Sequence, residues 1–201
     1  MSEIFIAPDG KSRCQWCAAT DQYLTYHDTE WGFPVDDDRR LFEKLCLESF
    51  QSGLSWRTIL AKRENFRAAF DQFDFNKMAE YTEQDVDRLV KDAGIVRHRG
   101  KIEAVINNAK RAQELIAREG SLAAYFWQFE PDPKSLPAPQ TQSKNDVSTE
   151  ISKELKKMGW KFVGPTTIYS FLQAMGLIND HIEGCITREL VEKAKAEFIR
   201  Q

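Results

Sequence analysis

The chain has 201 residues, of which 42% are hydrophobic and 29% are charged, and its formal net charge is −3. This composition is typical of a soluble globular protein with a sizeable core, and the acidic balance argues against a protein that coats nucleic acid. No stretch approaches the roughly 18 uninterrupted apolar residues of a membrane span, and the first residues lack the basic start and apolar run of a signal peptide. We therefore expect a cytoplasmic protein with no membrane partner, whose four cysteines bind metal or pack rather than form disulfides.

The hydrophobic pattern predicts an essentially all-α fold, with no strand of useful length and no internal repeat. Residues 1–13 are expected to form a loosely held lead-in, and residues 130–147, which contain four prolines, a loop between helical units. Apolar spacing and capping residues predict helices at 39–50, 56–70, 75–79, 82–91, 101–119, 148–158, 165–175 and 187–199.

The helix expected at 39–50 carries one carboxylate, Glu48, within its apolar stripe. Glu48 lies seven residues after Leu41 and three after Leu45, so it should face the protein interior. A buried carboxylate is unfavourable unless it is paired or hydrogen-bonded, so it either has a partner or belongs to a functional site. The stretch 14–56 also contains several tryptophans and tyrosines, and aromatic planes around one inward carboxylate suit a flat, electron-poor heterocycle such as a damaged nucleobase.

Two pairs of metal-competent residues lie near opposite ends of the chain. Cys14 and His27 are thirteen residues apart, and His181 and Cys185 are four apart. Thiolate and imidazole are the usual zinc ligands, and Cys₂His₂ is a closed set typical of structural sites. These residues are therefore candidates for a structural metal site that links the two ends of the domain. The spacing alone equally suits free thiols and two ordinary histidines. Cys17, three residues after Cys14, is a further candidate as a rival ligand or a redox partner.

Basic residues gather in two parts of the acidic chain. Residues 88–118 hold eight basic and three acidic side chains, and residues 152–161 hold four lysines and one glutamate. Such a face permits phosphate contacts, although solvated helix faces with no partner give the same pattern. Glycine turns at 94–102 and 162–167 each precede a helix whose free N–H groups can hold a phosphate oxygen. Contact with a DNA backbone is therefore a hypothesis, with candidate residues Arg97, Arg99, Lys101, Gly164 and Thr166.

Seven short blocks of the sequence form a specific combination: Arg-Cys-x-Trp (13–16), Tyr-His-Asp-x-Glu-Trp-Gly (26–32), Leu-Glu-x-x-Gln-x-Gly-Leu-Ser-Trp (47–56), Lys-Arg-Glu-Asn-Phe-Arg (62–67), Arg-His-Arg-Gly-Lys-Ile (97–102), Phe-Val-Gly-Pro-Thr-Thr (162–167) and Asn-Asp-His-x-x-Gly-Cys (179–185). Together they resemble the 3-methyladenine DNA glycosylase I family of the helix-hairpin-helix glycosylase superfamily. The resemblance implies an all-α helix-hairpin-helix glycosylase domain at 13–185, an N-terminal extension at 1–12 and a C-terminal helical tail at 186–201. It also implies one structural zinc ion, held by Cys14, His27, His181 and Cys185.

The same resemblance assigns roles to residues of the expected pocket. Glu48 and Tyr26 match the residues that hydrogen-bond the extruded base, and Trp56 matches the ring that stacks on it. Trp31 matches a further aromatic side chain of the pocket, with core packing as the alternative interpretation.

The implied activity is the repair of alkylated DNA. A monomeric enzyme would bind double-stranded DNA containing 3-methyladenine, flip the base out, hydrolyse its N-glycosidic bond, and leave an abasic site and the free base. Gly53 and Leu54 match the turn that probes the gap left in the duplex. No lysine is obviously placed as a Schiff-base nucleophile, which predicts a monofunctional enzyme, and we assign no catalytic role to Asp180.

Two other functions stay open at this level. One is a non-enzymatic helix-hairpin-helix DNA module with a structural zinc, in which the aromatic residues are only core. The other is a nucleoside or nucleotide hydrolase that acts on free small molecules. Release of a methylated base from alkylated duplex DNA distinguishes all three.

Overall fold

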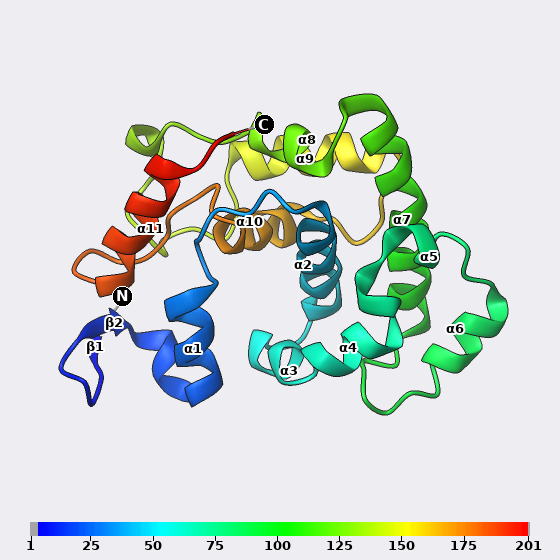
Figure 1. Ribbon diagram of the computed structural model, residues 1–201, viewed down its shortest axis with the longest axis horizontal. Helices are drawn as coiled ribbons and strands as arrows, with labels where there is room; N and C mark the ends of the chain where they lie inside the picture. Colours follow the sequence, from blue (N-terminus) through cyan, green and yellow to red (C-terminus); the bar gives the residue numbers. More distant parts are fainter. Residues whose placement is uncertain (1–3, 201) are drawn as a thin grey trace.

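A computed structural model describes residues 4–200, and most of them lie in helices (Figure 1). The helices and 3₁₀ turns are, in chain order, η1 (Gln15–Ala19), α1 (Asp21–Thr29), α2 (Asp38–Gln51), α3 (Trp56–Ala61), α4 (Arg63–Ala69), η2 (Asp71–Phe73), α5 (Phe75–Met78), α6 (Glu83–Leu89), α7 (Arg99–Glu119), α8 (Leu122–Trp127), η3 (Pro133–Ser135), α9 (Asp146–Lys157), α10 (Pro165–Ala174) and α11 (Ile186–Glu197). The predicted helical fold is confirmed. Within residues 4–200, no helix has the length and apolar character that a membrane crossing requires.

The helix α2 lies at the centre of the fold and packs against α10, α7, α3 and α8 (Figure 1). It begins at Asp37, whose side chain accepts a hydrogen bond from the backbone N–H of Arg40. Its apolar stripe, including Leu41 and Leu45, is fully buried in the core. Because α2 is covered on several sides, its polar residues near the C-terminal end are buried too, and Glu48 is among them.

The α-helices differ from the prediction in three places. No helix is predicted where α8 lies. The helix α1 is not predicted, because it buries only Tyr26 and His27 and so lacks an apolar stripe. Its start is fixed instead by Thr20, whose hydroxyl accepts a hydrogen bond from the backbone of Tyr23. The single helix predicted at 56–70 is two helices, α3 and α4, because the backbone leaves the helical region at Lys62.

The N-terminal lead-in is ordered, contrary to the prediction for residues 4–13. β1 (Ile4–Ile6) and β2 (Ser12–Cys14) form an antiparallel hairpin. The buried Arg13 guanidinium lies 2.8 Å from the Asp9 carboxylate and 2.9 Å from that of Asp28 on α1. Strands of three residues are too short to show an alternating pattern, which is why the sequence does not predict them. Residues 1–3 of the predicted lead-in lie outside the described residues.

The C-terminal helix α11 packs back onto the rest of the domain. Its buried face carries Thr187, Val191 and Lys195. The Lys195 ammonium donates to the carbonyl oxygens of Gly176 and Leu177, at 2.6 and 3.0 Å. A helix in this region is confirmed, while the division between domain and tail at 185/186 stays a prediction.

We expect Val191→Ala to lower the free energy of unfolding by about 2 kcal/mol, because it removes two buried methyl groups and leaves a cavity. Urea denaturation of the purified protein measures this. The neighbouring Leu190 is half-exposed, so Leu190→Ala should change stability by no more than about 0.5 kcal/mol. Equal small effects of both substitutions would show that α11 unfolds independently of the domain.

Candidate active site and metal centre

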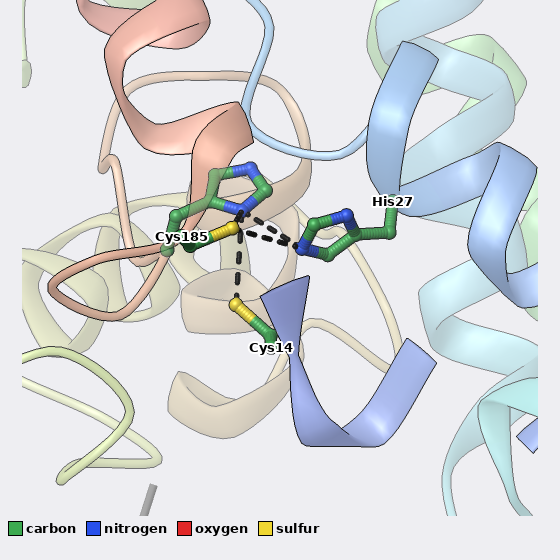
Figure 2. A group of neighbouring side chains, drawn as sticks. Cys14, His27 and Cys185 are labelled. Atoms are coloured by element: carbon green, nitrogen blue, oxygen red, sulfur yellow. Dashed lines mark hydrogen bonds between the residues drawn. The ribbon is translucent and has the colours of Figure 1, made fainter. Parts of the chain in front are cut away.

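Cys14, His27, His181 and Cys185 converge on one buried point, although they come from opposite ends of the chain. Figure 2 shows Cys14, His27 and Cys185 pointing toward one another. Their candidate ligand atoms all lie within 4.8 Å of one another. The His27 Nε2 atom is 3.1 Å from His181 Nδ1 and 3.5 Å from Cys185 Sγ. The His181 Nδ1 atom is 3.6 Å from Cys185 Sγ and 3.8 Å from Cys14 Sγ.

These separations fit the edges of a tetrahedral coordination shell. Bonds of about 2.3 Å to sulfur and about 2.1 Å to nitrogen give edges of about 3.4 Å between two nitrogens and about 3.6 Å between nitrogen and sulfur. The cluster can therefore hold a metal ion with little movement of its side chains.

The outer nitrogens of both histidines are hydrogen-bonded, which leaves the inner nitrogens free to act as ligands. The His27 Nδ1–H group donates to the Asp28 carboxylate at 2.8 Å, and His181 Nε2–H donates to the Trp31 carbonyl oxygen at 2.9 Å. Metal-ligating histidines characteristically make such bonds, because the bonds fix the tautomer and the ring orientation. The Gln140 side-chain amide also donates to Cys14 Sγ at 3.2 Å.

The cysteines differ in their surroundings. The Cys14 thiol and the two imidazoles lower the pKa of Cys185 well below its usual range. Cys17 is fully buried but is not a member of the cluster, and burial raises its pKa to about 12. Cys17 therefore packs in the core outside the cluster.

A pocket of about 240 Å³ lies beside this cluster and is lined largely by aromatic rings. Its lining residues come from η1, α1, the turn after α1, α2, α3 and α10. They are Trp16, Tyr23, Tyr26, Trp31, Glu48, Gln51, Trp56, Ser170 and Gln173. The rings pack against one another. Trp16 meets Trp31 edge-on with 5.1 Å between ring centroids, and the ring centroids of Tyr26 and Trp56 lie 5.5 Å apart. The four residues predicted to bind a base, Tyr26, Trp31, Glu48 and Trp56, are thus brought together.

The carboxylate of Glu48 is 5% exposed and has a counter-charge that sequence reasoning missed. Lys44, one helical turn earlier on α2, places its Nζ atom 2.8 Å from Glu48 Oε1 and 2.8 Å from the Tyr26 hydroxyl oxygen. Burial lowers the pKa of Lys44 and raises that of Tyr26, so the Tyr26 phenol stays protonated. The spacing of four residues between Lys44 and Glu48 is the sequence signal that could have revealed this pair.

Several other pocket residues carry no predictive signal in the sequence. Ser170 and Gln173 come from α10, far from α1 and α2 along the chain. Gln173 is oriented by Asp180, whose carboxylate accepts its side-chain amide hydrogen at 2.6 Å. Trp31 serves both parts of the site, because its ring lines the pocket and its carbonyl accepts from His181.

The turn between α2 and α3 lies at the edge of the pocket, since Gln51 and Trp56 on either side of it line the pocket. Gly53 has a φ of +80°, a conformation that favours glycine, and a side chain there would meet open space. Leu54 is an exposed apolar residue, at 43%. Both residues predicted to probe the duplex are therefore accessible.

The two glycine turns lie beside each other. His98 at the start of α7 has its ring 6.3 Å from that of Phe162, in the turn before α10, and Phe162 is exposed. Ser49 on α2 donates to the Phe162 carbonyl at 3.0 Å, and Ser152 on α9 donates to the Val163 carbonyl at 2.7 Å. These bonds fix the second turn against α2 and α9.

The candidate phosphate-binding residues fall into three groups. Arg97 and Thr166 are exposed, and Gly164 is the N-cap of α10. Arg99 is exposed but forms ion pairs with Glu83 and Asp87 on α6. Lys101 is buried, and its ammonium donates to the carbonyl oxygens of Phe50 and Ser52, where it supports the end of α2. Lys101 is therefore not accessible to a phosphate, contrary to the prediction.

The family model described as methyladenine glycosylase matches residues 16–189. The chain belongs to the methyladenine glycosylase family. A relative in this family, DNA-3-methyladenine glycosylase 1 of Escherichia coli (strain K12), is 49% identical over 177 residues, which cover 86% of this chain and 95% of the relative. Enzymes of this family are hydrolases of N-glycosyl bonds, and so is this chain.

Solved structures of the family have the same fold. The structure of 3-methyladenine DNA glycosylase I from Staphylococcus aureus, described as showing the basis of 3-methyladenine recognition, is 40% identical with a TM-score of 0.80, and covers 85% of this chain and 93% of its own. A variant of 3-methyladenine DNA glycosylase I in complex with 3-methyladenine is 39% identical with a TM-score of 0.83, and covers 88% and 97%. The matched span of the methyladenine glycosylase model includes the whole pocket, while Cys14 lies two residues before it.

We expect the purified protein to carry a metal ion at the Cys₂His₂ cluster, and Cys185→Ser to lose it and to melt at a markedly lower temperature. Loss of a ligand opens a closed structural site whose binding energy contributes to folding. Elemental analysis and thermal denaturation measure the two effects. Cys17→Ser is the matched control and should keep its metal, because Cys17 is buried outside the cluster. Equal metal content in wild type and Cys185→Ser would contradict the assignment.

Proposed function

We propose that the enzyme excises 3-methyladenine from alkylated double-stranded DNA, releasing the free base and leaving an abasic site. The observation that carries this proposal is Glu48, a carboxylate 5% exposed in the wall of a largely aromatic pocket of about 240 Å³. Family relatives support the substrate, since they are named for 3-methyladenine and one is described in complex with it.

In the proposed complex the base enters the pocket edge-first. Trp56 stacks on one face of the ring, and Glu48 accepts hydrogen bonds from the amino edge of the adenine. The Tyr26 hydroxyl accepts a hydrogen bond from Lys44, so its own hydrogen is free to donate to the base. Trp31 closes the pocket on the side of the metal centre.

Reaching such a pocket requires the base to leave the DNA stack, which costs least for a weakly paired, damaged base. Leu54 is the exposed apolar side chain nearest in sequence to the pocket edge, and we place it in the gap left by the flipped base. The backbone of the duplex would rest on the paired turns around Arg97 and Gly164, as in a helix-hairpin-helix module, with Arg99 and Thr166 beside them.

The chemistry needs little assistance from acidic or basic side chains. Alkylation at N3 makes the base cationic, so the base departs as a neutral group while water attacks the sugar carbon. Asp180 has no part in this step, because it is 5% exposed, lies outside the pocket lining, and is held by Gln140 and Gln173. Lys44 lies in an ion pair behind Trp56 and Tyr26, which supports a monofunctional enzyme without a Schiff-base step.

The metal at the Cys₂His₂ cluster is, in this proposal, one structural zinc ion. Two thiolates and two imidazoles in tetrahedral positions are the donor set and geometry that zinc favours. The ion would join the N-terminal hairpin, α1 and the loop before α11, and so hold Tyr26 and Trp31 in the pocket wall. We further propose that the enzyme acts as a monomer in the cytoplasm.

We expect Glu48→Gln to slow excision of 3-methyladenine about 10- to 100-fold, the equivalent of one charge-assisted hydrogen bond. Chromatography of the base released from methylated duplex DNA measures it. Glu64 on α4 is exposed, so Glu64→Gln is a matched control and should excise at the wild-type rate. Binding of lesion-free DNA should be unchanged in both variants.

Three outcomes of this assay decide between functions. Unchanged excision by Glu48→Gln would remove Glu48 from the site. No release by the wild type would favour a DNA-binding module without activity. Release from free nucleosides but not from the duplex would favour a nucleoside hydrolase.

A further inference from the structure

A lysine that sequence analysis does not predict contacts three of the residues around the proposed base site. The Lys44 ammonium lies 2.8 Å from both Glu48 Oε1 and the Tyr26 hydroxyl oxygen. It also lies 3.3 Å from the centre of the Trp56 ring, a close cation–π contact. Lys44 is 5% exposed, so these contacts are made away from water.

Lys44 acts from behind the pocket wall. Trp56 and Tyr26 line both the base pocket and a small cavity of about 30 Å³ on its other side. Glu48 lines only the pocket, whereas Lys44 lines only the small cavity. The lysine therefore does not touch the base, and it influences the base through Glu48 and through the Trp56 ring.

The other charged side chains around this position are mostly paired. The other charged groups near Lys44 are the ion pairs Glu30–Arg63, at 2.6 Å, and Glu43–Arg67, at 2.8 Å, together with the exposed Arg40. Glu48 is therefore matched by one ammonium and does not present a net negative charge. This corrects the sequence-based interpretation of the pocket as a lone anion framed by aromatic rings.

We propose that Lys44 sets the charge selectivity of the base site, so that the pocket favours the neutral departing base over the cationic base still attached to DNA. This inference rests on the excision function proposed above and deepens it. Lys44 is in this sense a positioning residue, since it acts through Glu48 and Trp56.

The reason lies in how charge moves during the reaction. The bond between the sugar carbon and the base nitrogen breaks, and its electron pair goes to the base, whose charge falls from positive to neutral. Water then bonds to the sugar carbon and releases a proton to solvent. A net negative pocket would stabilise the base most before the bond breaks, which raises the barrier instead of lowering it. The ammonium on one face of the Trp56 ring also disfavours a cationic base stacked on the opposite face, which lines the pocket.

The test compares two free ligands that differ in charge: neutral 3-methyladenine, and 3,9-dimethyladeninium, a fixed cation whose second methyl group stands for the sugar. Quenching of tryptophan fluorescence at mildly alkaline pH measures both dissociation constants. In Lys44→Met we expect the dissociation constant of the cation, divided by that of 3-methyladenine, to fall by about tenfold or more. Single-turnover excision from methylated DNA should become slower although the cationic ligand binds more tightly.

Two control variants separate charge from structure. Lys44→Arg keeps the charge and should keep the wild-type ratio of dissociation constants. Lys77 is an exposed lysine on α5, and Lys77→Met should leave ratio and rate unchanged. Lys44→Gln provides a second neutral variant with the same expected shift, and thermal denaturation verifies that each variant is folded.

The outcomes are distinct for the two proposals. A ratio within twofold of wild type in folded Lys44→Met and Lys44→Gln, both still binding 3-methyladenine, would overturn the role of Lys44 and leave the excision function intact. Failure of the wild type to bind either ligand would overturn the excision function, and this inference with it.

Discussion

The ion pair between Lys44 and Glu48 is the interaction on which the aromatic pocket depends. Removing two charges from water is expensive, and the cost is offset only when geometry is close and the remaining polar atoms find partners. Here the two groups lie 2.8 Å apart on one face of α2, and the ammonium also bonds the Tyr26 hydroxyl and covers the Trp56 ring. Three helices, α1, α2 and α3, are thus joined at a single charged point. The arrangement holds a carboxylate oxygen at the pocket surface without filling the pocket.

The metal cluster and the pocket share one wall, which explains why both terminal regions belong to the site. Successive residues of α1 serve the two functions, since Tyr26 lines the pocket and His27 belongs to the cluster. The Trp31 ring lies 4.6 Å from the His181 ring, and Trp16 lies 5.3 Å from His27. The α1 helix buries little apolar surface of its own, so its position is set by the cluster and by Arg13, which bonds Asp28. A metal ion that takes no part in the chemistry would in this way fix the distance between Tyr26 and Glu48.

The parts of this molecule that could be predicted from sequence are those with a repeating pattern. The α2 helix is long enough to repeat its apolar spacing, so its inward Glu48 could be predicted, and the metal set followed from the resemblance of seven motifs. The position of α1 could not be predicted, because its stability comes from contacts with residues about 150 positions away, such as His181. Lys44 was missed because lysines are normally exposed, and Lys101 was placed on the surface for the same reason. Ser170 and Gln173 enter the pocket only through the packing of α10 on α2.

A crystal structure of this chain with bound 3-methyladenine would show whether Glu48 recognises an alkylated purine inside the aromatic pocket. We expect the purine ring to stack on Trp56, on the side away from Lys44, with a Glu48 oxygen within hydrogen-bonding distance of the exocyclic amino group. We also expect the Lys44–Glu48 pair to stay intact when the ligand is bound. A purine bound elsewhere, or a Glu48 side chain turned away from it, would show that Glu48 is not the recognition residue.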